Sequence, residues 1–530
     1  MKKIKKLFVA IALCFMMVFI ASCNKKSSGI KASDIDMEIT TTRDKATVKL
    51  TLADNDNVKK EKATFYINCY TVNSDSEDYR TKQDVSFVNS VYTSATVNFT
   101  SLAANQEYKF VLYVTFNGKD SKLLEKNAST SDEVSATISS KEDFENNLTN
   151  DLDGEFKLTS DIDFGNEKIG LFTSEAKAFQ GKLDGGIYDE AGNLIGCHKI
   201  SNFQLTSNAF IGLFGYLKGA TIKNLIIENV KADYSTRSSA QIGGFIGYAV
   251  GSYIENVEVN NVSLSIAASS TAEHNTGAVV GLSERSTFKN VYAKDVEINY
   301  TSAKIKMNIG GFAGEMIGDA LTEGITAKSC GVEGKITLVS DYTSSGTNKE
   351  FINIGGFVGS LSAKGVIDDC YAKAEAIYGV NNQKRTFDLS IGGFVGTNKS
   401  NMYIKNSLAI ALINAYAGLL PEDDTTPDYS TEYLASGVAY IGGFIGKANG
   451  VFRGIEASYC KELGKSYITA NDIRKETVDD VETDKEVLYA GSFYGYADSK
   501  SETYIIDSEY ITTEVPENLS TRLKELLQVK

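Results

Sequence analysis

The stretch Ile354-Gly355-Gly356-Phe357-Val358-Gly359 decides the fold, because close copies of it recur through the second half of the chain. Eight copies begin at Ile211, Ile242, Thr276, Ile309, Ile354, Ile391, Ile441 and Ala490. Their closing glycines lie 32, 34, 33, 45, 37, 50 and 49 residues apart. A basic period of about 33 residues, lengthened later by insertions, predicts a stack of similar units, that is, a solenoid.

The residues after each closing glycine predict what a unit is made of. Seven positions after each of the first three closing glycines, apolar residues begin to step by 3, 2 and 3. The second unit shows this pattern in Ile254, Val257, Val259 and Val262. A step of two is typical of a strand, and a step of three of a strand with a bend. We therefore expect one coil of β-structure per unit, whose inward side chains stack about 4.8 Å apart.

Glycine and asparagine occupy special positions in this pattern. We expect the glycines at bends, where a positive φ or a close backbone approach excludes a Cβ atom. Asn224, Asn256, Asn290 and Asn406 each precede an inward position, where stacked amides would hydrogen-bond along the column. Since parallel crossovers are overwhelmingly right-handed, the expected fold of residues 211–516 is a right-handed parallel β-helix.

The Gly-Gly-Phe-x-Gly cores resemble the GLUG motif of bacterial surface proteins, with degenerate copies at Ala278 and Ser492. The resemblance implies a right-handed parallel β-helix on a secreted or surface-anchored protein. It implies no enzymatic activity, and there are no catalytic residues to carry over. Some secreted peptidases contain such repeats beside a catalytic domain, but this chain has no His-Glu-x-x-His motif.

Segments on both sides of the repeats are expected to cover the ends of the solenoid. Residues 139–143 offer Ser-x-x-acid capping boxes ahead of Phe144, Leu148 and Leu152, which predicts a short helix. Residues 156–164 and 179–185 resemble the entry segment of bacterial β-helices, so residues 134–210 are expected to cover the first coil. Leucines at 523, 526 and 527 predict a helix within residues 517–530 that caps the final coil.

Residues 34–130 alternate apolar and polar side chains in short runs, which predicts half-buried strands. About seven such strands favour a β-sandwich, so the predicted fold class is all-β: a sandwich followed by the β-helix. Leu102 to Tyr108 resembles the tyrosine corner of fibronectin type III domains, although the tryptophan usual in that core is missing. A spacer module and a ligand site on its loops both remain open.

The first 33 residues predict where the protein is held. Four lysines precede an apolar run over residues 7–20, which is typical of a signal peptide and, at about 21 Å as a helix, too short to span a membrane. Ile20-Ala21-Ser22-Cys23 resembles the bacterial lipobox. That resemblance implies cleavage after residue 22, acylation of Cys23, a tether over residues 23–33, and a bacterial cell envelope location with the membrane as partner.

Composition excludes several classes of function. The formal net charge is −14 and no basic stripe interrupts it, so we expect no nucleic acid partner. His198 and His274 are the only histidines, which leaves little for histidine catalysis or zinc. Cys330 and Cys370 are expected at the column position of Val257 in adjacent coils, where either a disulfide or two buried thiols would fit.

The acidic residues offer little chemistry. Glycoside hydrolysis needs two carboxylates converging across a bond, but the doublets 368–369, 423–424 and 479–480 are sequence neighbours. Asp161, Asp163 and Asp184 would bind Ca²⁺ only if they met in space. We therefore predict no catalytic, cofactor or metal residue.

Three insertions, near residues 333–353, 414–440 and 464–490, lengthen the later coils, and in solenoids such insertions often form the binding face. The tyrosines that accompany them suit sugar stacking or loop packing equally: Tyr416, Tyr429, Tyr433, Tyr440, Tyr467 and Tyr489. Two functions follow. One is non-enzymatic binding of a glycan or host protein by a lipid-anchored surface protein, and the other is a polysaccharide lyase or glycoside hydrolase.

Overall fold

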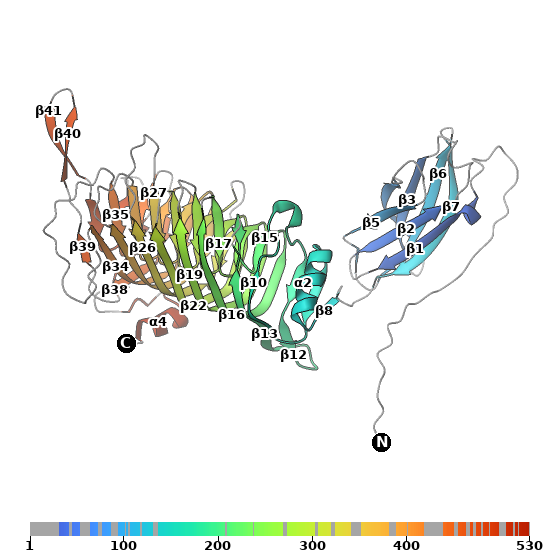
Figure 1. Cartoon of the computed structure of the whole chain (residues 1–530), viewed down its shortest axis with the longest axis horizontal. Helices are drawn as coiled ribbons and strands as arrows, with labels where there is room; N and C mark the ends of the chain where they lie inside the picture. Colours follow the sequence, from blue (N-terminus) through green and yellow to red (C-terminus); the bar gives the residue numbers. More distant parts are fainter. Residues whose placement is uncertain are drawn as a thin grey trace, which may run out of the picture. The chain divides into compact units, whose positions relative to one another are not determined.

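The computed structural model divides the chain into two compact units, Met1–Glu133 and Val134–Lys530 (Figure 1). It describes residues 31–41, 45–52, 64–72, 77–85, 94–100, 102–103, 106–116, 119–130, 136–206, 209–236, 238–268, 273–302, 306–319, 324–340, 351–380, 388–399, 401–417, 438–449, 454–462, 467–469, 473–478, 481–486, 488–497, 505–511, 515–517 and 519–528. The expected signal peptide over residues 1–22, Cys23, the acid doublets 423–424 and 479–480, and Tyr429 and Tyr433 lie outside these ranges.

The first unit is a sandwich of two antiparallel sheets. After a short 3-10 turn, η1 (Ala32–Asp34), one sheet has the order β1-β2-β5 and the other β4-β3-β6-β7. Their strands are β1 (Ile35–Thr41), β2 (Ala46–Leu52), β3 (Thr64–Val72), β4 (Glu77–Val85), β5 (Ser94–Phe99), β6 (Glu107–Phe116) and β7 (Lys119–Ser129). Phe99 and Phe110 pack edge to face, 5.1 Å apart, in the core between the sheets.

The second unit is a parallel β-helix built from three long sheets (Figure 1). Each coil contributes one strand to sheet 1, one to sheet 2 and one to three to sheet 3. The fold class of the chain is therefore all-β, an antiparallel sandwich followed by a parallel β-helix.

Sheet 1 contains β14 (Phe210–Ile211), β17 (Ala240–Gly243), β20 (His274–Gly277), β23 (Met307–Gly310), β27 (Phe351–Gly355), β31 (Asp388–Gly392), β35 (Ala439–Gly442) and β42 (Leu488–Gly491). Sheet 2 contains β15 (Phe214–Lys218), β18 (Ile246–Val250), β21 (Val280–Glu284), β24 (Ala313–Ile317), β28 (Val358–Ser362), β32 (Val395–Asn398), β36 (Ile445–Ala448) and β43 (Tyr494–Ala497).

Sheet 3 starts with β8 (Ala136–Ile138), β9 (Glu155–Leu158), β10 (Ile162–Ile169), β11 (Lys182–Asp184), β12 (Gly186–Tyr188) and β13 (Leu194–Leu205). It continues through β16 (Thr221–Thr236), β19 (Tyr253–Ala268), β22 (Thr287–Ser302), β25 (Ile325–Lys328), β26 (Gly331–Ser340), β29 (Gly365–Asp368), β30 (Tyr371–Val380), β33 (Met402–Lys405) and β34 (Leu408–Ala417). It ends with β37 (Gly454–Glu456), β38 (Tyr459–Glu462), β39 (Tyr467–Thr469), β44 (Ile505–Ile506) and β45 (Glu509–Tyr510).

The predicted 3, 2, 3 pattern sets the register of sheet 3. Ile222 pairs with Ile254, and Leu225 pairs with Val257, in adjacent parallel strands. Val257, Val259 and Val262 are almost fully buried. Like residues thus lie above like residues, and the interior is a continuous apolar column.

The repeated glycines lie where backbones meet. A Cβ atom on Gly355 would overlap the carbonyl oxygen of Val358 in its own turn, and one on Gly356 would overlap the carbonyl oxygen of Gly393 in the next coil. Neither glycine has a positive φ. Of the two expected reasons for glycine, close approach is therefore the one that applies at this motif.

Positive φ occurs instead at one repeated position of sheet 3, which is mostly asparagine or aspartate and has φ between 46° and 57°. Its members, one per coil, are Asn224, Asn256, Asn290, Ser329, Asp369, Asn406, Ala457 and Asp507. Asn256 Nδ2 donates to Asn224 Oδ1 at 2.8 Å, and Asn406 Nδ2 donates to Asp368 Oδ1 at 2.9 Å. Asparagine and aspartate tolerate the left-handed region because their short polar side chains bond locally.

The phenylalanine of the motif forms a ladder through the later coils. Successive rings of Phe312, Phe357, Phe394, Phe444 and Phe493 are nearly parallel, with centroids 4.6, 4.8, 4.9 and 5.0 Å apart. That spacing matches the distance between neighbouring strands. The stacked rings therefore align successive coils, and the glycines let the backbones of these coils approach closely enough for the rings to stack.

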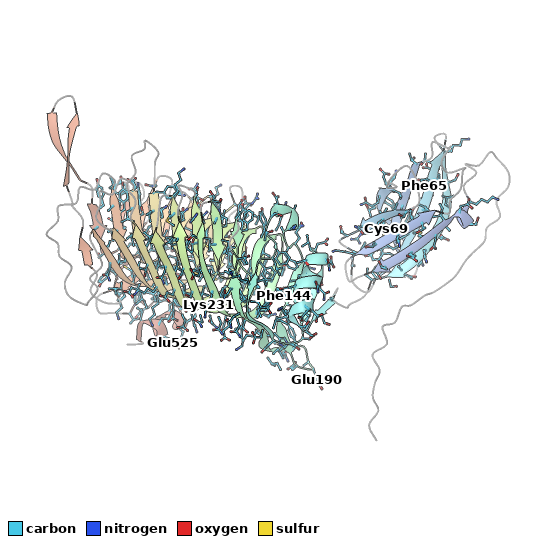
Figure 2. All side chains as sticks on the ribbon, in the orientation of Figure 1. Phe65, Cys69, Phe144, Glu190, Lys231 and Glu525 are labelled. Carbon is cyan, nitrogen blue, oxygen red and sulfur yellow. The ribbon has the colours of Figure 1, made fainter. Side chains whose placement is uncertain are left out.

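The first coil is covered by α2 (Lys141–Asn150), whose N-terminal Ser140 accepts a hydrogen bond from the Asp143 N–H. Phe144 and Leu148 are fully buried, and Phe144 lies where α2 meets the coils (Figure 2). Phe144 packs edge to face against Phe164 and Phe214. A 3-10 turn, η2 (Glu175–Lys177), follows β10.

The C-terminal helix does not lie where we predicted it. α4 (Thr521–Gln528) packs on the outer face of sheet 3, not on the end of the final coil. Its leucines pack in one apolar cluster with an outer row of sheet 3, Tyr371, Leu408 and Tyr459, and burial of these side chains holds the helix there. Arg522 lies 5.1 and 5.5 Å from the ring centroids of Tyr292 and Tyr371 and also pairs with Asp369.

Replacement of Gly356 by alanine tests the close-approach explanation. We expect Gly356→Ala to lower the free energy of unfolding by about 1–3 kcal/mol, because the new methyl group must push two coils apart. Chemical denaturation followed by circular dichroism measures this change. Gly324→Ala is the matched control, since nothing lies within 4 Å of the position that its new methyl group would take. Equal effects of the two substitutions would contradict the explanation.

Candidate functional site

Asp161, Asp163 and Asp184 do not form a calcium site. Asp161 accepts from the Lys199 N–H, Asp163 from the Gly165 N–H, and Asp184 from the Gly186 N–H. Each carboxylate thus holds local backbone of the cap or of the first coils. Among the described residues, no three acidic, histidine or cysteine side chains gather closely enough to hold a metal ion.

Asp368, the last residue of β29, and Asp369, in the bend that follows, have different partners. Asp368 lies in a row of alternating charge, 3.6 Å from Lys405 Nζ and 4.0 Å from Lys328 Nζ. Asp369 accepts from the hydroxyls of Ser329 and Ser520, at 2.8 and 2.7 Å, and so anchors the start of α4. Both carboxylates have structural partners.

Cys330 and Cys370 are both free thiols, although they lie at the same column position in adjacent coils. The disulfide considered from the sequence is therefore not formed. Each Sγ donates to a carbonyl two residues earlier in its own strand, Lys328 O and Asp368 O, both at 3.3 Å. Burial raises the pKa of the Cys370 thiol well above its ordinary value.

One carboxylate pair carried no signal in the sequence. Burial raises the pKa of Glu273, and the negative charge of Glu315 raises it further. Glu315 is almost buried, 3.2 Å from Lys399 Nζ, and accepts from the Ser360 hydroxyl at 3.3 Å. The two glutamates belong to different coils and do not share a motif, so no spacing along the chain marked the effect of one charge on the other.

His274 is an inward residue of the third coil, not a surface catalyst. Its Nε2 lies 3.0 Å from the Ser238 carbonyl oxygen, and its Nδ1 has no hydrogen-bond partner among the described residues. Thr276 and Tyr300 hydrogen-bond at 2.6 Å in the same interior. Burial lowers the pKa of His274, so the ring is neutral near pH 7.

The insertions differ in how much of them the structure describes. Residues 341–350 and 418–437 lie outside the described ranges. The third insertion contains β39 and an antiparallel hairpin of β40 (Ile473–Val478) and β41 (Val481–Glu486), which projects from the β-helix (Figure 1). Tyr416 and Tyr467, which the sequence singled out, are strand residues in β34 and β39.

Two of the predicted tyrosines come together with two residues that we had not singled out. We define the tyrosine cluster as Tyr440, Lys447, Tyr489 and Tyr496, from β35, β36, β42 and β43. Ring centroids of its tyrosines are 5.5–5.6 Å apart, and Tyr440 and Tyr489 are stacked at 14°. Lys447 Nζ lies 4.1 Å from the centroid of the Tyr440 ring.

The cluster lies on the outside of the β-helix. Side chains alternate along a strand, and the neighbours Ala439, Ile441, Ala448 and Ala497 all belong to the interior core. Burial lowers the pKa of Lys447, while the carboxylate of Asp388 acts in the opposite direction. Three tyrosines and one ammonium group at a place where insertions meet the coil make this cluster the candidate binding site.

No protein-family model matches this chain, and no curated protein matches it. Among solved structures it is similar to the family 28 exopolygalacturonase of Yersinia enterocolitica, at 10% identity. The match covers 76% of this chain and 98% of that chain, with a TM-score of 0.15. A score this low carries no argument about function, and the fold described above rests on the strand pairing alone. None of the described helices is long and apolar enough to cross a membrane.

The buried histidine predicts a pH dependence of stability. The pKa of His274 is lowered in the folded state, so the unfolded chain binds the proton first as pH falls. Stability from this residue is thus present above the unfolded pKa of about 6.5 and is lost as pH falls below it, by at most about 1.4 kcal/mol for each pH unit.

A comparison of variants isolates this contribution. Met307 occupies the same column position in the next coil, so His274→Met should pack there and lose less stability between pH 7.5 and pH 5.5 than the wild type. Urea titrations at the two pH values measure the difference. His198→Asn is the control, and a pH dependence unchanged in His274→Met would refute the assignment.

Proposed function

We propose that this chain is a lipid-anchored protein of the bacterial cell envelope that binds a glycan or a host protein and catalyses no reaction. The β-helix presents the binding site, and the sandwich serves as a spacer. The observation that carries the proposal is the tyrosine cluster, which gathers three rings and an ammonium group on an outer face where inserted segments meet the coils.

The lipid anchor is supported by the sequence at the start of the chain. A basic segment, an apolar run and the resemblance of Ile20-Ala21-Ser22-Cys23 to the lipobox favour acylation at Cys23. Cleavage would remove four lysines and no acid, leaving a mature charge of −18. Several acyl chains on one residue, at about 0.8 kcal/mol per buried CH₂, would hold the chain at the membrane surface.

The two family resemblances are consistent with local geometry. In the sandwich, the buried Tyr108 hydroxyl accepts a hydrogen bond from the Ala103 N–H at 2.7 Å, as a tyrosine corner requires. In the β-helix, the closing glycine of every copy of the GLUG-like motif is the second residue of a sheet 2 strand, just after the turn from sheet 1. These features support a surface protein with a fibronectin type III-like module and GLUG-type repeats.

The alternative function, polysaccharide cleavage, rests on Glu273 and Glu315. A carboxyl group with a raised pKa near a second carboxylate suits a general acid. Glu315, however, is paired with Lys399 and hydrogen-bonded by Ser360, which suits a structural role better. The other carboxylates singled out from the sequence and described in the structure have structural partners.

The anchor is tested by replacement of the acylated cysteine. We expect Cys23→Ala to abolish incorporation of radiolabelled palmitate and to move the protein from the detergent phase to the aqueous phase of a Triton X-114 partition. Cys14→Ala, in the apolar run of the signal peptide, is the matched control and should keep its label. Undiminished labelling of Cys23→Ala would contradict the anchor.

The binding function is tested with residues 24–530. We expect these residues to bind at least one immobilised glycan or extracellular-matrix protein and to release no reducing ends or unsaturated uronic acids from polysaccharides. Glu315→Gln should bind as the wild type does. Cleavage activity that disappears in Glu273→Gln or Glu315→Gln would establish the alternative.

A further inference from the structure

The tyrosine cluster occupies the last layer of the β-helix. β42 and β43 are the terminal strands of sheets 1 and 2. Tyr489 pairs with Tyr440 of the preceding coil, and Tyr496 pairs with Lys447. Within the described residues, no further coil follows Tyr489 and Tyr496 in these sheets, so the side of each ring that faces away from the preceding coil has no stacking neighbour from a next strand.

Residues of the preceding coil hold the rings of Tyr489 and Tyr496 in place. Tyr440 is nearly buried and lies between Lys447, 4.1 Å from its centroid, and Tyr489, stacked 5.5 Å away at 14°. Tyr496 meets Tyr489 edge to face, 5.5 Å away at 69°. Both terminal rings remain half-buried, so part of each is open to solvent. The result is a rigid aromatic corner whose ordering cost is met in folding and not in binding.

The chemistry of the corner favours a sugar ring. A tyrosine ring offers an apolar face at low conformational cost and a hydroxyl at its rim. A pyranose ring presents an apolar C–H face and hydroxyl groups at its edge, so it can stack on one ring and hydrogen-bond to the other. Such a ligand would continue the column of stacked rings by one more layer, about 4.8 Å beyond Tyr489.

The charge of the surroundings distinguishes between three possible ligands: an anionic polysaccharide, a second copy of this chain and a neutral sugar. The hairpin that leads into β42 carries six acids and three bases over residues 473–486, for a net charge of −3. The whole chain is also acidic, with a formal charge of −14. Lys447 is the one ammonium group of the tyrosine cluster and lies against the Tyr440 ring, so the net negative charge of the hairpin and of the chain disfavours an anionic polysaccharide. Two copies joined at this end would each bring the same net negative charge. A neutral sugar meets neither cost.

We propose that Tyr489 and Tyr496 form a stacking site for a neutral pyranose ring of a glycan at the C-terminal end of the β-helix. This inference rests on the proposed binding function and names its site and ligand class. Tyr440 and Lys447 are positioning residues that keep the two terminal rings in place.

Isothermal titration of residues 24–530 with cello-, laminari-, manno-, xylo- and chito-hexaose, and with polygalacturonate, tests the site. We expect a neutral hexaose to bind, and Tyr489→Ala and Tyr496→Ala each to weaken that binding about tenfold or more, the effect of losing about 1.4 kcal/mol. Tyr489→Phe keeps the ring and should bind within about threefold of the wild type, a change of under 1 kcal/mol.

Tyr248→Ala is the matched control. Tyr248 belongs to the same outer column of sheet 2 as Tyr496, but it lies between Tyr216 and Leu282 of neighbouring coils. It should leave affinity unchanged, and circular dichroism confirms that each variant is folded.

Four results would overturn the inference. Binding by the wild type that survives Tyr489→Ala/Tyr496→Ala moves the site elsewhere and leaves the proposed function intact. Preference for polygalacturonate refutes the neutral ligand, and a dimer in sedimentation velocity that Tyr489→Ala dissociates assigns the corner to a second copy. Absence of glycan binding by the wild type, with binding of a matrix protein, refutes the sugar site while the broader binding function stands.

Discussion

The β-helix depends on one steric constraint, the close approach of backbones at the turn between sheets 1 and 2. At Gly355 a methyl group would overlap the turn itself, and at Gly356 it would overlap the next coil. Because glycine leaves this space free, the coils can pack closely and Phe357, the next residue, lies in the interior. Five such phenylalanine rings stack at the strand spacing. The cap and α4 bury further apolar side chains against the coils, but neither sets their register.

Much of the fold could be predicted from the sequence because each repeat carries its own local pattern. The 3, 2, 3 spacing placed Cys330 and Cys370 at the column of Val257, where the structure has them. The position of α4 could not be predicted in this way, because Arg522 finds Tyr292 across 230 residues of sequence. An amphipathic helix indicates that it will pack, but not on which surface.

The candidate site shows the same limit. Tyr440 and Tyr489 were singled out because they flank insertions, yet Lys447 and Tyr496 carried no comparable signal. Their alternation with buried alanines Ala448 and Ala497 is the pattern that would have identified them as outward residues. Glu273 and Glu315 were missed for a related reason, since they belong to different coils and no spacing along the chain links them. Asp368 and Asp369, the one acid doublet that the structure describes, have separate partners.

The central claim is that residues 211–510 form in-register coils about one axis, and distances between spin labels test it most directly. Lys223 and Lys405 lie in one outer column, five coils apart. Labels at Lys223→Cys and Lys405→Cys, with Cys197 replaced by serine, should therefore be about 24 Å apart, or about 4.8 Å per coil. Labels at Lys223→Cys and Lys289→Cys should be closer by about three coils, or about 14 Å. Equal distances for the two pairs, or a separation far above the first value, would contradict the account.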